Sequence, residues 1–136
     1  NVFVKLDGTK VIDHLQVNGR LKAEDAQIEE MQINGQTTLD RCLIKQKSNV
    51  CGALIATDSR FADKLSVSSE RAVFNSCNLT SLHILRVGGY HGVQVVELRG
   101  KTRIDGPITF DSGKGEVIAD PDAEISRGVI GREIRK

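Results

Sequence analysis

The sequence predicts an all-β protein, a single-stranded parallel β-helix of about seven turns with three short strands in each turn. Three observations support this fold class. Apolar residues recur every 16 to 18 residues, they come in pairs two residues apart, and glycines recur at one place in the repeat. A repeat of fixed length indicates stacked copies of one unit. A spacing of two is the period of a β-strand, because alternate side chains point to opposite faces.

The repeat is clearest when equivalent residues of successive turns are written as rows along the axis of the coil. Almost every member of these rows is apolar or small. The rows are Val17, Ile33, Val50, Val67 and Ile84; Leu21, Thr37, Leu54 and Ala72; Ala23, Leu39, Ala56 and Phe74; Ala26, Cys42, Ser59 and Cys77; and Ile28, Ile44, Phe61 and Leu79. Polar residues lie between these positions, so we expect the rows to fill the coil and the polar residues to face solvent.

Each turn contains inward-facing pairs such as Leu15 with Val17, and the chain must bend between one pair and the next. Three pairs in each turn predict three walls and a roughly triangular cross-section. One bend is occupied by glycines, which tolerate a positive φ, and aspartates lie at or near another. The glycines are Gly19, Gly35 and Gly52, and the aspartates are Asp25, Asp40 and Asp58.

We expect one β-helix domain over residues 1–136. Residues 1–13 form an incomplete first turn or a cap. The pattern weakens at 86–92, which we interpret as a shortened or looped turn, and it resumes at Val95. Residues 126–136 form a C-terminal tail, whose basic side chains are Arg127, Arg132, Arg135 and Lys136.

The charge and hydropathy of the chain argue against two classes of partner. Nineteen Lys and Arg against 18 Asp and Glu leave a net charge of +1, whereas nucleic-acid-binding domains carry a basic patch. No apolar run approaches the roughly 20 residues of a membrane span. We therefore predict neither a nucleic-acid partner nor a membrane span. Since the chain begins at Asn1, a trimmed N-terminal segment with a lipid anchor remains open.

Three cysteines are present, and their places in the repeat predict no disulfide within the chain. Cys42 and Cys77 share a row but lie two turns apart, about 10 Å. A disulfide needs Cα atoms within roughly 7 Å. Cys51 follows the inward Val50 and should point outward. The spacing also matches no zinc pattern, so we predict no metal and no cofactor.

Several motifs carry a resemblance to a known family. Residues 98–131 read LRGKTRIDGPITFDSGKGEVIADPDAEISRGVIG. The earlier units VNG, ING and VCG, at 17–19, 33–35 and 50–52, have the same apolar-x-Gly motif. The chain resembles bactofilin-like, polymer-forming bacterial β-helix envelope proteins. The resemblance implies a right-handed coil, a role in assembly or as a scaffold, and no catalytic residues. It also implies the bacterial periplasm or cell envelope, with the cytoplasm as the alternative. The chain departs from the motif at 68–78, which lacks glycine, and at 88–92.

The most unusual local feature is the segment Gly88–Gly92, which reads GGYHG and contains the single tyrosine. Loops that interrupt a regular scaffold often carry function, so Tyr90 and His91 are the candidate binding residues. The alternative is a connector that relieves a change of register. His83 lies between inward positions and should face solvent. Acyltransferases of the left-handed β-helix type use a histidine base, but their inward residues are six apart, so we predict no catalytic residue.

We expect a non-enzymatic structural module, either a scaffold or a self-associating part of the bacterial envelope. Its partner would be another copy of itself or another envelope protein. The alternative is an adhesin-like module that binds a glycan or a protein through the Gly88–Gly92 loop. A polysaccharide-cleaving enzyme would need convergent acids, and the acids of this chain are spread over its bends.

Overall fold

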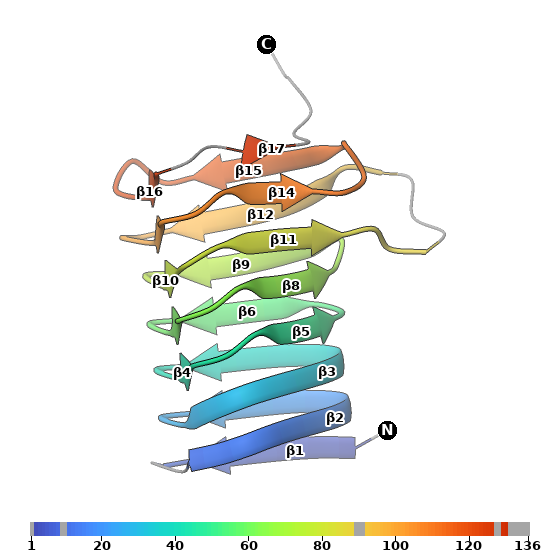
Figure 1. The fold of residues 1–136 in the computed structure, drawn as a ribbon, viewed down its shortest axis with the longest axis vertical. Coiled ribbons are helices and arrows are strands. Elements are labelled where there is room, and N and C mark those ends of the chain that lie inside the picture. The colour runs from blue at the N-terminus through green and yellow to red at the C-terminus, as the bar shows by residue number, and fades with distance from the viewer. Residues whose placement is uncertain (1, 9–10, 89–91, 127–128, 131–136) are drawn as a thin grey trace.

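The computed structural model describes residues 2–8, 11–88, 92–126 and 129–130. Their secondary structure is entirely β, without a helix. The strands pair in parallel and stack into a solenoid of about seven turns, so the predicted fold class is confirmed (Figure 1). From the N-terminal end upward, the chain crosses the near side of Figure 1 from left to right and returns along the far side, which makes the coil right-handed.

Three ladders of parallel strands form the three walls. Two long strands, β2 (Val11–Glu24) and β3 (Gln27–Asp40), each run through all three. The far wall adds β1 (Val2–Asp7), β6 (Leu54–Thr57), β9 (Arg71–Asn75), β12 (Gln94–Arg99) and β15 (Gly115–Ala119). The short wall adds β4 (Leu43–Ile44), β7 (Arg60–Phe61), β10 (Asn78–Leu79), β13 (Arg103–Ile104) and β16 (Glu124–Ile125). The near wall adds β5 (Ser48–Cys51), β8 (Leu65–Ser68), β11 (Leu82–Leu85), β14 (Ile108–Phe110) and β17 (Val129–Ile130).

The inward rows stack as predicted, and they form one continuous core inside the tube. One row that passes through every turn consists of Ile12, Ile28, Ile44, Phe61, Leu79, Ile104 and Ile125. Phe61 meets Phe74 of the neighbouring row edge to face, with ring centroids 6.1 Å apart. Because each inner side chain contacts those of the turns above and below, the hydrophobic effect holds the turns together along the whole coil.

Glycine is required at the corner between the near and far walls. Gly35 has a φ of 141°, which favours glycine, and a Cβ built on it would lie 1.6 Å from the carbonyl oxygen of Gly19. At Gly52 the same Cβ would lie 2.2 Å from the oxygen of Gly35. The backbones of successive turns therefore approach so closely at this corner that a side chain has no room.

The corner between the far and short walls uses the left-handed backbone region instead. Asp25, Arg41, Asp58 and Ser76 have φ values of 49° to 53°. The predicted aspartates thus mark this corner, although in the second turn the left-handed residue is Arg41 rather than Asp40. The N–H of Asp25 donates to the carbonyl of Asp40 at 2.9 Å, and the other three residues repeat this bond one turn further on. Short polar residues tolerate this conformation better than most, and the ladder around the bend stays bonded.

The segment at 86–92 is a lengthened corner and not a shortened turn. The chain from Ile84 of β11 to Val96 of β12 is more than twice as long as the equivalent stretch from Val67 to Ala72 in the turn before. The regular spacing of the repeat therefore holds only as far as Leu79, and the next two steps of that row are both longer. A corner can absorb extra residues because it does not alter the pairing of the strands on either side.

The predicted burial of two cysteines and exposure of the third are confirmed. Cys42 and Cys77 are buried free thiols, and Cys51 is an exposed one. The Sγ atoms of the buried pair donate to the carbonyls of Ala23 and Ala56 at 3.4 and 3.3 Å. Burial raises the pKa of both thiols, that of Cys77 to about 11. The two buried cysteines are thus neutral core residues.

Candidate functional site

Tyr90 and His91, the residues proposed from the sequence for binding, lie outside the described residues. The structure does describe how the lengthened corner is fastened. The buried Gln94 side chain donates through Nε2 to the carbonyls of Leu85 and Ser69, at 2.8 and 2.9 Å. Its Oε1 accepts a bond from Ser112 Oγ at 2.9 Å. Gln94 therefore ties the end of the lengthened corner to its beginning and to the turns on both sides.

A hollow of about 510 Å³ lies at the glycine corner, and Val87 of the lengthened corner forms part of its wall. The other sides come from the turns nearer the N-terminal end, with Asn34, Cys51 and Ser68 on the near wall and Arg71 on the far wall. The glycines make this hollow, since no side chain fills the corner between the two walls. Amide, thiol and hydroxyl groups, the Glu70 carboxylate and the Arg71 guanidinium line it beside an apolar patch.

His83 faces outward as predicted, but it is half-buried and paired. It lies in an outer row between Ser66 and Thr109. Its Nε2 is 2.6 Å from Oδ1 of Asp111. Arg86 donates through Nε to the backbone carbonyl of Asp111 at 3.3 Å. These contacts join the start of the lengthened corner to β14, and they make His83 part of that anchorage.

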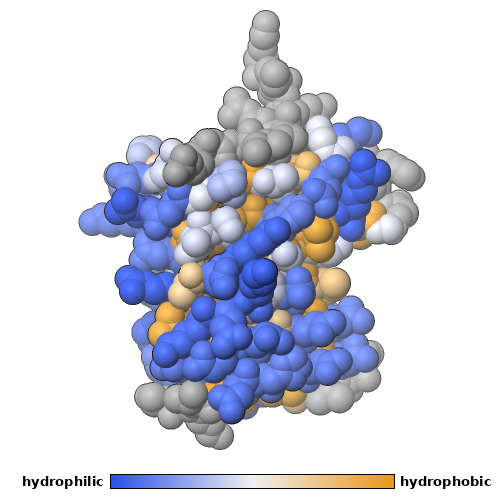
Figure 2. All heavy atoms as spheres, viewed as in Figure 1, coloured by the Kyte–Doolittle hydropathy of each residue, from blue (hydrophilic) through white to orange (hydrophobic). Residues whose placement is uncertain are grey.

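The outer side of the near wall is unusually poor in charge in its first turns. Figure 2 looks onto this wall and shows hydrophilic residues over most of its lower half. Two outer rows there carry amide, hydroxyl or thiol groups: Gln16, Gln32, Asn49 and Ser66, and Asn18, Asn34, Cys51 and Ser68. No interaction in the described part of the chain ties down the five amide side chains of these rows.

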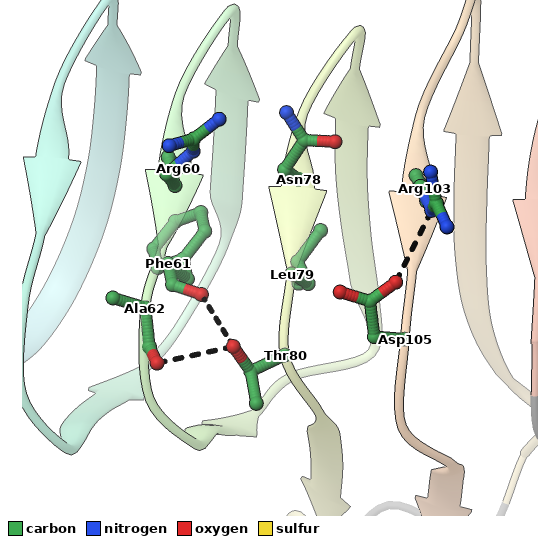
Figure 3. A pocket seen from close by; sticks show the side chains of 8 residues that line it. All are labelled: Arg60, Phe61, Ala62, Asn78, Leu79, Thr80, Arg103 and Asp105. Carbon is green, nitrogen blue, oxygen red and sulfur yellow. Dashed lines mark hydrogen bonds and ion pairs between the residues drawn. The ribbon is translucent and has the colours of Figure 1, made fainter.

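A second hollow, of about 520 Å³, lies on the outer side of the short wall (Figure 3). Arg60, Asn78 and Arg103 stand in one row along it, on three successive turns. Ala62 and Thr80 border it at the neighbouring positions, and Asp105 accepts a bond from Arg103 Nε at 3.1 Å. Sequence reasoning placed Arg60 outside but missed this cluster, because the step from Asn78 to Arg103 spans the lengthened corner.

The far wall carries an acid whose surroundings could not be read from the repeat. Glu97 alternates with the inward Val96 and Leu98, yet its side chain is only 9% exposed. Arg71 and Arg99 cover it, with a hydrogen bond from Arg71 and a contact of 3.1 Å from Arg99. The Arg71 bond holds the pKa of the Glu97 carboxyl below its usual range, and Arg99 adds to this effect while partial burial opposes it.

In the part of the chain that the structure describes, the first and last turns of the coil each have a neighbouring turn on one side only. At the N-terminal end β1 pairs only with β2, and at the C-terminal end β15, β16 and β17 each pair with one strand among the described residues. Apolar residues that would be core in an inner turn are only half-buried here. They are Val4, Leu6, Ile12 and Leu15 at the N-terminal end and Val117, Ala123 and Ile125 at the C-terminal end. Within the described residues, both ends thus combine strand edges that have no partner strand with half-buried apolar side chains.

Within the described residues, no group of three or more His, Cys, Asp or Glu side chains is arranged to hold a metal ion. The same residues include no helix that is long and apolar enough to cross a membrane. Comparisons with protein-family models, with curated proteins and with solved structures find no match to this chain.

Proposed function

We propose that this chain is a non-enzymatic structural module of the bacterial cell envelope, which serves as a scaffold by stacking on further copies of itself end to end. The observation that carries the proposal is the match between its two open ends. The envelope setting rests on the sequence resemblance alone.

The register of the walls defines how one copy would follow another. Val4 begins the far-wall row that ends at Val117. Ile12 begins the short-wall row that ends at Ile125. If the C-terminal end of one copy meets the N-terminal end of the next in this register, Val117 lies against Val4 and Ile125 against Ile12. Both contacts place apolar on apolar, as in the inner turns.

The backbone supports the same arrangement. Parallel strands at an open end present unpaired N–H and C=O groups, which favour pairing with another chain. Head-to-tail stacking continues the parallel ladder of all three walls, whereas stacking of two like ends would need antiparallel pairing. An association of unlike ends does not close on itself, so it produces an extended filament.

Two charge substitutions in the same row test the proposal. Val4→Lys blocks the N-terminal end, and Val117→Lys blocks the C-terminal end, because each places an ammonium group between two apolar surfaces. We expect the unmodified protein to grow with concentration in sedimentation velocity, and each variant alone to stay a monomer. An equimolar mixture should form a dimer and nothing longer, since one intact pair of ends remains.

The mixture also controls for folding, because a misfolded variant cannot restore the dimer. Ile118→Lys is the matched control, since Ile118 follows Val117 but faces outward and is 49% exposed. It should assemble as the unmodified protein does. An unmodified protein that stays monomeric at high concentration, or a single variant that dimerises alone, contradicts head-to-tail stacking.

A second candidate function is an adhesin-like module that binds a glycan or a protein through the Gly88–Gly92 loop. The observation that favours it is the lengthened corner fastened by Gln94 beside the 510 Å³ hollow. The test is retention on a panel of immobilised glycans. The double variant Tyr90→Ala and His91→Ala should lose the retention and keep the unfolding midpoint. Unchanged retention would make the loop a connector.

A further inference from the structure

The hollow on the short wall gathers hydrogen-bond donors at one place (Figure 3). Arg60 and Arg103 lie two turns apart, so their backbones are separated by about 10 Å. Asn78 lies between them in the same row. An arginine side chain is long enough to reach half of that distance. Both guanidinium groups can therefore meet one small ligand held over Asn78.

These donors are available. No interaction within the described part of the chain engages the side chain of Arg60 or of Asn78. Arg103 gives its Nε to Asp105 at 3.1 Å and lies 4.0 Å from Glu124, so its far terminal nitrogen stays free. The bond from Asp105 also orients Arg103, which lowers the entropy that a ligand must overcome to order it.

The surroundings favour an anion. Thr80 Oγ1 donates to the carbonyls of Phe61 and Ala62 at 3.2 and 3.1 Å, so it has no proton left for an anion, and the donors must come from Arg60, Asn78 and Arg103. The lining of the pocket contains two guanidinium groups and one carboxylate, and a second carboxylate, that of Glu124, lies outside the lining at 4.0 Å from Arg103 Nε. The small side chain of Ala62 leaves space between Arg60 and Thr80, and the hollow of about 520 Å³ holds a group larger than a single ion.

We propose that this pocket binds a phosphate group. A tetrahedral oxyanion presents oxygens in several directions, so Arg60 and Arg103 can bind it from opposite sides while the Asn78 amide donates from below. A carboxylate presents its two oxygens in one plane and suits a single guanidinium fork. The site lies on the side of the coil and not on an end face, so it does not depend on end-to-end stacking.

The experiment is an NMR titration of the protein with inorganic phosphate, glycerol 3-phosphate and acetate at matched ionic strength. Phosphate should bind saturably and shift the backbone amide signals of Ala62 and Thr80. Arg60→Gln and Arg103→Gln should each weaken binding about tenfold, the loss expected for one charge-assisted hydrogen bond. The control is Arg20→Gln, which removes an arginine of the far wall that lies over the ring of Phe3, and it should leave the affinity unchanged.

Three results would overturn the proposal. Acetate that binds as tightly as phosphate would indicate a carboxylate site. An equal loss in Arg20→Gln would indicate diffuse attraction to positive charge, and shifts without saturation would indicate no site. The two phosphate probes distinguish the source of the ligand. Equal binding of both supports an esterified phosphate, and binding of inorganic phosphate alone supports the free ion.

Discussion

The glycine corner makes the most direct prediction about stability. Replacement of Gly35 by alanine adds one methyl group where its carbon would lie 1.6 Å from the carbonyl oxygen of Gly19. Ordinary contact between such atoms is above 3 Å, so the two turns must separate by more than 1 Å at this corner. Such a shift is large against the strand spacing of about 4.8 Å. We therefore expect the bonds of the ladder beside the corner to weaken.

The magnitude follows from three contributions. A φ of 141° is strained for any residue with a side chain, at a cost of about 1–3 kcal/mol. Overpacking against a backbone atom that cannot move aside adds about 1–3 kcal/mol, and one weakened ladder bond about 1 kcal/mol. We expect a loss of about 4 kcal/mol or more, a large part of the roughly 5–15 kcal/mol that stabilises a typical domain.

The assay is equilibrium unfolding in urea, with Gly113→Ala as the matched control. Gly113 also has a positive φ, of 71°, but a Cβ built there meets nothing within 4 Å. This control should lose only about 1–2 kcal/mol from the backbone conformation. If Gly35→Ala is no more destabilising than Gly113→Ala, the turns do not approach at the glycine corner as described.

Three further predictions concern the core, the covered acid and the thiols. Among the described buried side chains, the Thr37 hydroxyl alone lacks a hydrogen-bond partner. Thr37→Val should therefore raise the unfolding free energy by about 1 kcal/mol in urea denaturation. A decrease in the unfolding free energy would show that the hydroxyl does have a partner. Because Arg71 lowers the pKa of Glu97 in the folded state, Glu97 should stabilise the fold fully above the ordinary glutamate pKa of about 4.3 and lose this effect as the pH falls through its lowered value. The loss of unfolding free energy caused by Glu97→Gln should therefore become smaller between pH 7 and pH 3. A loss that stays constant with pH would contradict a lowered pKa of Glu97 in the folded state. In a thiol titration at pH 7, Cys51 should react rapidly and the two buried cysteines only after unfolding; three fast thiols would contradict their burial.

Much of the fold could be predicted because a solenoid repeats its constraints. The row from Ile28 to Leu79 is visible in the sequence, since each turn must place an apolar residue at the same height and angle. The glycine corner is visible for the same reason, because each turn meets the one below it at a fixed distance. Handedness came from the family resemblance, since either hand of coil satisfies the same periodicity.

The candidate sites were harder to predict because they depend on irregular steps. The long step from Leu79 to Ile104 hides the register, so Arg103 could not be aligned with Arg60 from spacing alone. The burial of Glu97 was missed for a different reason. Its position alternates as a solvent-facing one, and only the structure shows that Arg71 and Arg99 cover it. The partners of long, flexible side chains depend on the tertiary structure, and the period of the repeat does not predict them.

The lengthened corner after β11 has a practical consequence for anyone who wishes to label or decorate the molecule. The strands on either side keep their pairing although the connection is much longer than the one before it. The position of each strand along the axis of the coil is therefore set by its pairing with neighbouring strands and not by the length of the connection before it. A fluorescent tag or foreign epitope inserted after Val87 would be displayed on the side of the coil, while the end turns stay unchanged.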